Sequence, residues 1–98
     1  MPGVTRDGDA TTTGHGCDAT TTVTGPSTNV FCNSLGVERK TDPTASHDIT
    51  VGVGCVPHTS SISAGSSTVF VNSKAIARIT DACDSGAITG GSTNVFAG

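Results

Sequence analysis

The sequence contains no tryptophan and no tyrosine, and only three phenylalanines and one methionine stand among its 98 residues. Large apolar side chains contribute about 1.5–3 kcal/mol each when buried, so this chain has few of the groups that usually stabilise a core. A chain of this length is expected to form one domain, residues 1–98, with a small buried volume. We therefore expect an additional staple, which in small folds is a disulfide, a metal ion or a partner subunit.

Charged residues are also scarce. They make up 13% of the chain, the net charge is −3, and Arg39 and Lys40 form the only adjacent basic pair. This composition excludes the basic surface that nucleic-acid binding requires. The N-terminus lacks a basic region followed by an apolar run, and the longest apolar stretches, such as Val69 to Val71, are far too short to span a membrane. We expect a protein that is made in the cytoplasm and stays soluble there.

Glycine, serine, threonine and asparagine are abundant, and the apolar residues stand between them in short bursts. Ile49, Val51 and Val53 alternate with smaller or polar residues, a pattern typical of a half-buried strand. No segment has a convincing helical pattern. The sequence therefore predicts an all-β fold of short strands and tight turns.

An internal repeat organises the chain. Residues 30–42 and 69–81 are identical at seven of thirteen positions, and residues 93–96 repeat residues 28–31 as a third, shorter copy. A Gly-Ser turn precedes each copy, and an Asn-Ser pair follows the Val-Phe strand in the two longer ones. The unit is thus a hairpin followed by a second turn. The apolar residues just before the Gly-Ser turns are Val23, Ile62 and Ile88.

An aspartate stands at the head of each unit, at Asp9, Asp42 and Asp81. Three such units predict hairpins arranged around a pseudo-threefold axis. All but one of the histidines and cysteines, the softer metal ligands of the chain, lie between one of these aspartates and the next Gly-Ser turn. These are His15, Cys17, His47, Cys55, His58 and Cys83.

Four ligands of this kind, brought together where the three head segments converge, would suit a tetrahedral zinc ion. The remaining cysteine, Cys32, occupies the position of Val71 in the second copy, so we expect it to be a small buried hydrophobe. Four cysteines also permit three disulfide pairings. Because no secretory signal is present, we expect reduced thiols and favour the metal over disulfides.

A catalytic role is not expected. A site closed by four protein ligands is structural, because a catalytic zinc keeps one position open for water. Asp48 beside His47 and Asp18 beside Cys17 are candidate bases or supporting groups, but aspartates in such loops are usually turn residues. No nucleophile has a recognisable local setting. We predict no enzyme activity, no catalytic residues and no small-molecule substrate.

These features resemble the PAAR-repeat family. Residues 65–81 look like its hallmark segment, with Ala75-Ile76-Ala77-Arg78 where the family usually has Pro-Ala-Ala-Arg, and Gly8-Asp9 and His15-Gly16 match its opening. The chain departs from the pattern at three places. Only the arginine of the tetrad is kept in residues 36–39, threonine replaces glycine before Asp42 and Asp81, and two residues separate Cys83 from Gly86.

The resemblance implies a cone of short β-hairpins with pseudo-threefold symmetry, a triangular base and a metal ion at its apex. By position it implies a structural zinc, with iron as the less favoured metal. The ligands it implies are His15, His47, His58 and Cys83. Cys55 is the alternative to His47 in this set.

The resemblance also implies a role. Such proteins cap the trimeric β-helical spike of contractile phage tails and of type VI secretion systems, one copy per trimer, and touch the target membrane only transiently. The absence of an added toxin or adaptor domain favours the phage, hence a place in the virion at the baseplate spike tip after assembly in the host cytoplasm. The alternatives are a type VI secretion spike tip, a disulfide-stapled extracellular binding module and a small zinc hydrolase.

Overall fold

The computed structural model describes residues 1–98 and contains strands but no helix. Ten short strands form five antiparallel pairs, each joining neighbours along the chain. The strands are β1 (Ala10–Thr12), β2 (Thr20–Thr22), β3 (Phe31–Cys32), β4 (Leu35–Gly36), β5 (His47–Val51), β6 (Gly54–His58), β7 (Phe70–Val71), β8 (Lys74–Ala75), β9 (Ala82–Cys83) and β10 (Gly86–Ala87). The all-β prediction is confirmed. Since the chain forms no helix, it contains none that could span a membrane.

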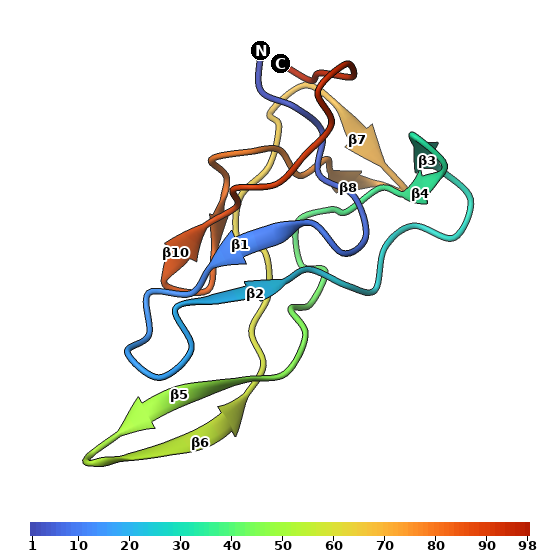
Figure 1. Cartoon of the computed structure of the whole chain (residues 1–98). Helices are drawn as coiled ribbons and strands as arrows, with labels where there is room; N and C mark the ends of the chain where they lie inside the picture. Colours follow the sequence, from blue (N-terminus) through green and yellow to red (C-terminus); the bar gives the residue numbers. More distant parts are fainter.

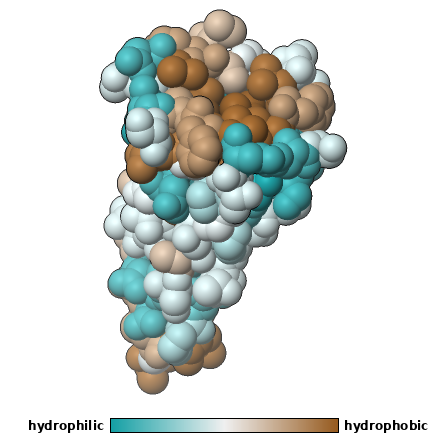
Figure 2. Space-filling view, turned by 90° about the vertical axis from the view of Figure 1, so that its right-hand side faces the viewer, coloured by the Kyte–Doolittle hydropathy of each residue, from teal (hydrophilic) through white to brown (hydrophobic).

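The molecule is a cone, with principal extents of 41 × 24 × 21 Å. Its broad end holds both chain termini and the β3–β4 and β7–β8 hairpins, and its narrow end is the β5–β6 hairpin (Figures 1 and 2). We call the broad end the base and the β5–β6 hairpin the tip hairpin. The three units therefore contribute unequally, because the middle unit alone supplies the narrow end.

Three backbone hydrogen bonds close a ring around the pseudo-threefold axis. The N–H of Thr5 donates to the carbonyl of Ala77, that of Ala77 to Glu38, and that of Glu38 to Thr5, all at 3.0 Å. These three residues, which we call the axial ring, each precede the arginine of a unit and are fully buried. The N-terminus completes the shortened third copy, since Gly3 pairs with Phe96 as Gly36 pairs with Phe31. The predicted pseudo-threefold arrangement is confirmed.

An arginine and an aspartate three residues later fasten each unit to its head segment. The carboxylate of Asp9 accepts the backbone N–H of Arg6 at 2.8 Å and its guanidinium Nε–H at 2.9 Å. The same pair of bonds joins Arg39 to Asp42 and Arg78 to Asp81. Charge-assisted bonds of this kind are short and directional, so they fix where each head segment leaves the base.

The core is as thin as the composition predicts and divides into two clusters. The cluster nearer the base contains Cys32, so the prediction that this cysteine behaves as a buried hydrophobe is confirmed at 5% exposure. The second cluster contains Val23, Ile62 and Ile88, the three residues expected before the Gly-Ser turns. None of the tip hairpin belongs to either cluster.

The alternating apolar pattern at residues 49–53 is only partly realised as predicted. Ile49 and Val51 do lie in β5, but burial decreases toward the end of the strand, and Val53 lies in the turn and is completely exposed. The half-buried strand is therefore wrong for Val51 and Val53. The physical reason is that the hairpin projects beyond both clusters, so no second layer exists to cover its end.

Threonine occupies a left-handed backbone conformation at two of the three unit heads. Thr41 and Thr80 have φ of 82° and 80°, and the equivalent Gly8 has φ of 84°. Glycine adopts this conformation without penalty, whereas a β-branched residue is strained in it. Both threonines are exposed, so no packing contact offsets the strain.

Replacing Thr41 or Thr80 with glycine is therefore expected to stabilise the protein by about 1 kcal/mol each, because the relief of left-handed strain exceeds the added freedom of the unfolded chain. Urea unfolding would measure the change. Gly8→Thr is the matched control, since no atom lies within 4 Å of the Cβ it would add, and it should destabilise by a similar amount. Loss of stability in Thr41→Gly and Thr80→Gly would contradict this account.

Glu38 is a buried carboxyl group in the axial ring. It is 0% exposed, and neither of its carboxylate oxygens has a hydrogen-bond partner. Burial, followed by the negative charges of Asp42 and Asp7, raises its pKa from 4.5 to about 9. The folded protein therefore keeps Glu38 protonated near neutral pH, whereas the unfolded chain ionises it.

This difference gives stability a defined dependence on pH. Between pH 4.5 and 9 the folded state binds the proton that the unfolded state releases, so the free energy of unfolding falls as pH rises. Against Glu38→Gln, which cannot ionise, the wild type should lose about 3 kcal/mol between pH 4.5 and pH 7. Urea unfolding of both proteins across this range is the measurement. Parallel curves for the two proteins would refute the burial of a neutral Glu38.

Candidate metal centre

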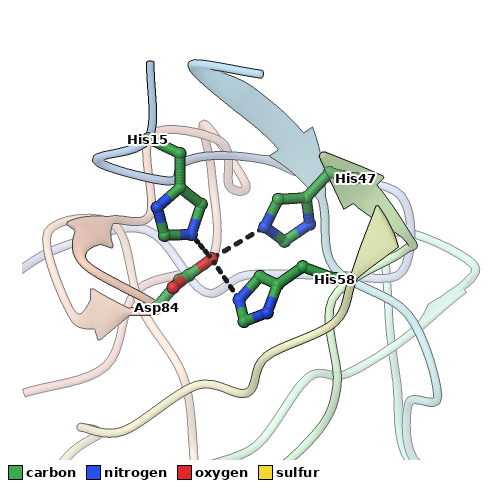
Figure 3. A group of neighbouring side chains, drawn as sticks. All are labelled: His15, His47, His58 and Asp84. Carbon is green, nitrogen blue, oxygen red and sulfur yellow. Dashed lines mark hydrogen bonds and ion pairs between the residues drawn. The ribbon is translucent and has the colours of Figure 1, made fainter. Parts of the chain in front are cut away.

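Three histidines from two segments converge near the start of the tip hairpin. His15 lies in the loop between β1 and β2, and His47 and His58 form the pair at the open end of the hairpin, opposite each other in the β5–β6 register. A third segment supplies Asp84, from the tight turn between β9 and β10. Figure 3 shows the three imidazoles arranged around the Asp84 carboxylate.

One oxygen of Asp84 lies at the centre of this group. Its Oδ2 is 2.8 Å from Nε2 of His15, 2.8 Å from Nε2 of His47 and 3.5 Å from Nε2 of His58. One candidate ligand atom from each of the four residues lies within 4.8 Å of the others. The His47 and Asp84 side chains are 2% and 6% exposed, so the group is largely shielded from water.

The imidazoles hold one another in place. The His15 and His47 rings stack at 5.4 Å between centroids, and the His58 ring stands edge-on to both. His47 also places Nδ1 3.0 Å from the Ala45 carbonyl, which turns its Nε2 toward Asp84. In metal sites such a bond on the second ring nitrogen fixes the tautomer that leaves the first one free to ligate.

Charge and burial act against each other in this cluster. Burial alone would raise the pKa of Asp84, but hydrogen bonds from His47 and His15 outweigh it and hold that pKa below its usual value. Burial likewise opposes the charged form of His47, but bonds to the Ala45 carbonyl and to Asp84 raise its pKa. Asp84 therefore stays ionised, as a metal ligand must be.

One further observation indicates that these four residues can hold a metal ion. Nε2 of His58 is buried and has no hydrogen-bond partner, although it faces the same point as the other two imidazoles. At 3.5 Å its contact with Asp84 Oδ2 is too long for a good hydrogen bond, and a cation at this point would satisfy it together with the other three ligand atoms. Three imidazole nitrogens and one carboxylate oxygen are an acceptable ligand set for zinc and for other first-row metals.

The structure places Cys83 away from this cluster. Its side chain is fully buried in the second hydrophobic cluster, and its backbone pairs with Ile62. It stands two residues after its head aspartate, as Thr11 and Thr44 do, and all three residues are buried. The repeat thus contained the signal that position 83 belongs to the core. The residue missed by the sequence reasoning is its neighbour, Asp84.

Cys17 and Cys55 form a disulfide, with Cα atoms 6.0 Å apart. The prediction of reduced thiols throughout is therefore wrong for this pair, and Cys55 is excluded as the alternative fourth ligand while it is bonded. The reason is spatial, because pairing of β5 with β6 brings Cys55 against the loop that carries Cys17. Cys32 and Cys83 are the free cysteines. The sequence reasoning treated disulfide and metal as alternatives, whereas the structure has a disulfide beside the cluster.

Of the two candidate bases, Asp18 has a positioning role in the structure. Asp18 accepts the backbone N–H of Asp48 at 2.6 Å, which joins the β1–β2 loop to the tip hairpin. Neither residue belongs to the His–Asp cluster.

The fold and the cluster together define a class: a small β-hairpin cone, pseudo-threefold at its base, with a potential metal site where its head segments meet. A family model described as the PAAR motif matches residues 7–90, nearly the whole chain. The chain belongs to the PAAR-motif family, which confirms the resemblance seen in the sequence. A comparison with curated proteins found no match. Family membership supports a spike-tip protein of a phage or a type VI secretion system.

Proposed function

We propose that this protein is a structural cap on the end of a trimeric β-helical spike, one copy per trimer. The observation that carries the proposal is an apolar base with the symmetry of the repeat. Phe31, Phe70 and Phe96 occupy equivalent positions there and are 62%, 59% and 50% exposed. Exposed apolar patches of this kind mark interaction sites, and Figure 2 shows apolar residues gathered at the broad end.

Pseudo-threefold symmetry supports a trimeric partner. A single chain that presents three similar apolar sectors can meet three identical strand ends at once. Its short base hairpins also leave backbone groups free at their edges, and strand addition from the partner would satisfy groups on both sides. A cap of this kind would close the end of the spike and taper it to the width of the tip hairpin.

The machine that carries the spike is either a phage baseplate or a type VI secretion system. The phage baseplate, and with it a place in the virion, stays the sequence-based prediction. The identity of the partner tests it, because a lysozyme-bearing spike would indicate a phage. A disulfide is also expected for the alternative of an extracellular binding module. The spike-tip role, however, accounts for both the family match and the apolar base.

We also propose that His15, His47, His58 and Asp84 hold a structural zinc ion, with Asp84 in the place expected for Cys83. Zinc, when bound, supplies the folding energy that the thin core lacks, on the order of 10 kcal/mol in small zinc domains. The four residues come from three separate segments, so holding one ion restrains all three. Four protein ligands leave no vacant position for a reacting water, which supports a structural and not a catalytic role.

The metal assignment predicts about one zinc per chain in the purified protein, measured by elemental analysis. Asp84→Ala and His58→Ala should each lose the metal and lower the melting temperature. Cys83→Thr is the matched control, because threonine occupies the equivalent positions 11 and 44, and it should retain the metal. The assignment is wrong if no stoichiometric zinc or iron is found, or if Cys83→Thr loses the metal while Asp84→Ala retains it.

The docking assignment predicts co-purification with the trimeric spike of the same machine at one copy per trimer. Replacing Phe31, Phe70 and Phe96 together with serine should weaken binding at least about a hundredfold, because three large apolar contacts are lost. Thr20→Ala, at an exposed position on the side of the cone, is the control and should bind like the wild type. Retained metal would show that the serine variant is folded. Undiminished co-purification of that variant would exclude the base as the docking surface.

A further inference from the structure

The end of the tip hairpin is apolar, although nothing in the structure covers it. Val51 is 57% exposed, Val56 is 42% exposed and Val53 is completely exposed. Figure 2 shows a separate apolar patch at the narrow end of the cone, where the tip hairpin lies, remote from the apolar base. Spike docking through the base leaves this second patch in water.

The hairpin is held firmly just behind this patch. The disulfide joins Cys55, which pairs with Thr50, to Cys17 in the β1–β2 loop. Val51 and Gly54, one residue of each strand, and the two turn residues Gly52 and Val53 extend beyond that link. At a rise of about 3.3 Å per residue, the two residues on each side of the hairpin reach at most about 7 Å past the disulfide. The apolar end is therefore a rigid projection of fixed length.

Charge is absent from the projection and reappears behind it. No aspartate, glutamate, lysine or arginine lies between Asp48 and Lys74. Asp48 stands two residues behind the disulfide-linked position, with Asp18 bonded to its backbone. The uncharged end can enter an apolar medium. The negative charges behind it would then lie at the surface of that medium, which must not be anionic itself.

A protein partner fits this patch poorly. A stable interface buries roughly 800 Å² on each partner, contributed by some 20–30 residues, whereas the projection has four residues. Pro57 removes a backbone donor from β6, and proline on an exposed strand disfavours pairing with another chain. The size and shape of the end instead match the depth of about 5–10 Å to which apolar groups enter the interface of a bilayer.

We propose that the end of the tip hairpin, residues 51–54 with Val56, inserts into the interfacial region of a zwitterionic phospholipid bilayer and makes the first lipid contact. The inference rests on the proposed spike-tip role, which brings this end of the cone to a membrane. Insertion is shallow, because an isolated two-stranded hairpin has unpaired backbone groups at both edges that hydrocarbon cannot satisfy. Asp18 and Asp48 then lie at the level of the headgroups and oppose binding to anionic lipid.

The chain offers a clean reporter for this contact, because it contains no tryptophan and no tyrosine. Val53→Trp in the full chain, which we call the tip reporter, places a single fluorophore at the proposed point of insertion. It is mixed with millimolar vesicles of dioleoylphosphatidylcholine in which part of the lipid carries brominated acyl chains. Emission from the tip reporter should fall at least about twofold, since bromine quenches only fluorophores at the acyl boundary. Adding Val51→Asp should lower the affinity of the tip reporter for the vesicles about tenfold, so that more lipid is needed for the same quenching.

Two matched reporters separate insertion from other binding. Thr89→Trp, at an exposed position on the side of the cone, should show no quenching, and Val95→Trp at the base should be quenched less than the tip reporter. Replacing a quarter of the lipid with phosphatidylglycerol should weaken the response of the tip reporter. Unchanged emission from the tip reporter, equal quenching of the tip and side reporters, or stronger quenching of the base reporter would each overturn the proposal. None of these readouts involves the spike or the metal, so failure here is distinguishable from failure of the proposed function.

Discussion

The axial ring is the constraint on which the rest of the structure depends. Three hydrogen bonds join Thr5, Glu38 and Ala77 in a closed cycle, so each unit is fixed to both of its neighbours by the backbone. The arginine after each ring residue binds the head aspartate of its unit, so all three aspartates lie at a similar distance from the ring. All three head segments therefore leave the ring toward the narrow end. The Val-Phe strands lie on the opposite side. Base and tip are thus consequences of one ring of main-chain bonds with few side chains involved.

The tip hairpin lies beyond the reach of the two hydrophobic clusters, and different interactions hold it. The His–Asp cluster and the disulfide both connect the β1–β2 loop to the hairpin, through His15 with His47 and His58, and through Cys17 with Cys55. Each restraint reduces the conformational entropy that the other must overcome. Coupling of this kind is reciprocal: closing the disulfide strengthens a metal site by the same factor by which a metal favours the disulfide. Small size and scarce aromatic residues make such paired restraints necessary.

The sequence predicted those parts of the molecule that repeat. Val23, Ile62 and Ile88 are buried, and Asn33-Ser34 and Asn72-Ser73 form turns with positive φ, because each pattern occurred more than once in the chain. The three histidines were identified for a similar reason, since all lay in head segments. The fourth member of the cluster was not. Choosing between Cys83 and Asp84 requires knowing which of two adjacent side chains faces the core, and a tight turn with φ of 55° at Asp84 decides that. The disulfide was missed because it depends on the approach of two loops that no local pattern encodes.

Departures from the repeat account for what is specific to this protein. The head segment of the middle unit, residues 43–64, is the longest and builds the whole tip hairpin, whereas that of the third unit, residues 82–89, is the shortest and forms only the turn that presents Asp84. A symmetric cone would bring three equivalent loops to its apex, so every ligand type there would have to occur three times. Unequal loops allow three imidazoles and one carboxylate to meet at a point, and leave one hairpin to extend past it. Symmetry at the base suits the trimeric partner proposed above, and its loss toward the tip lets three imidazoles and one carboxylate meet there and leaves a single apolar end.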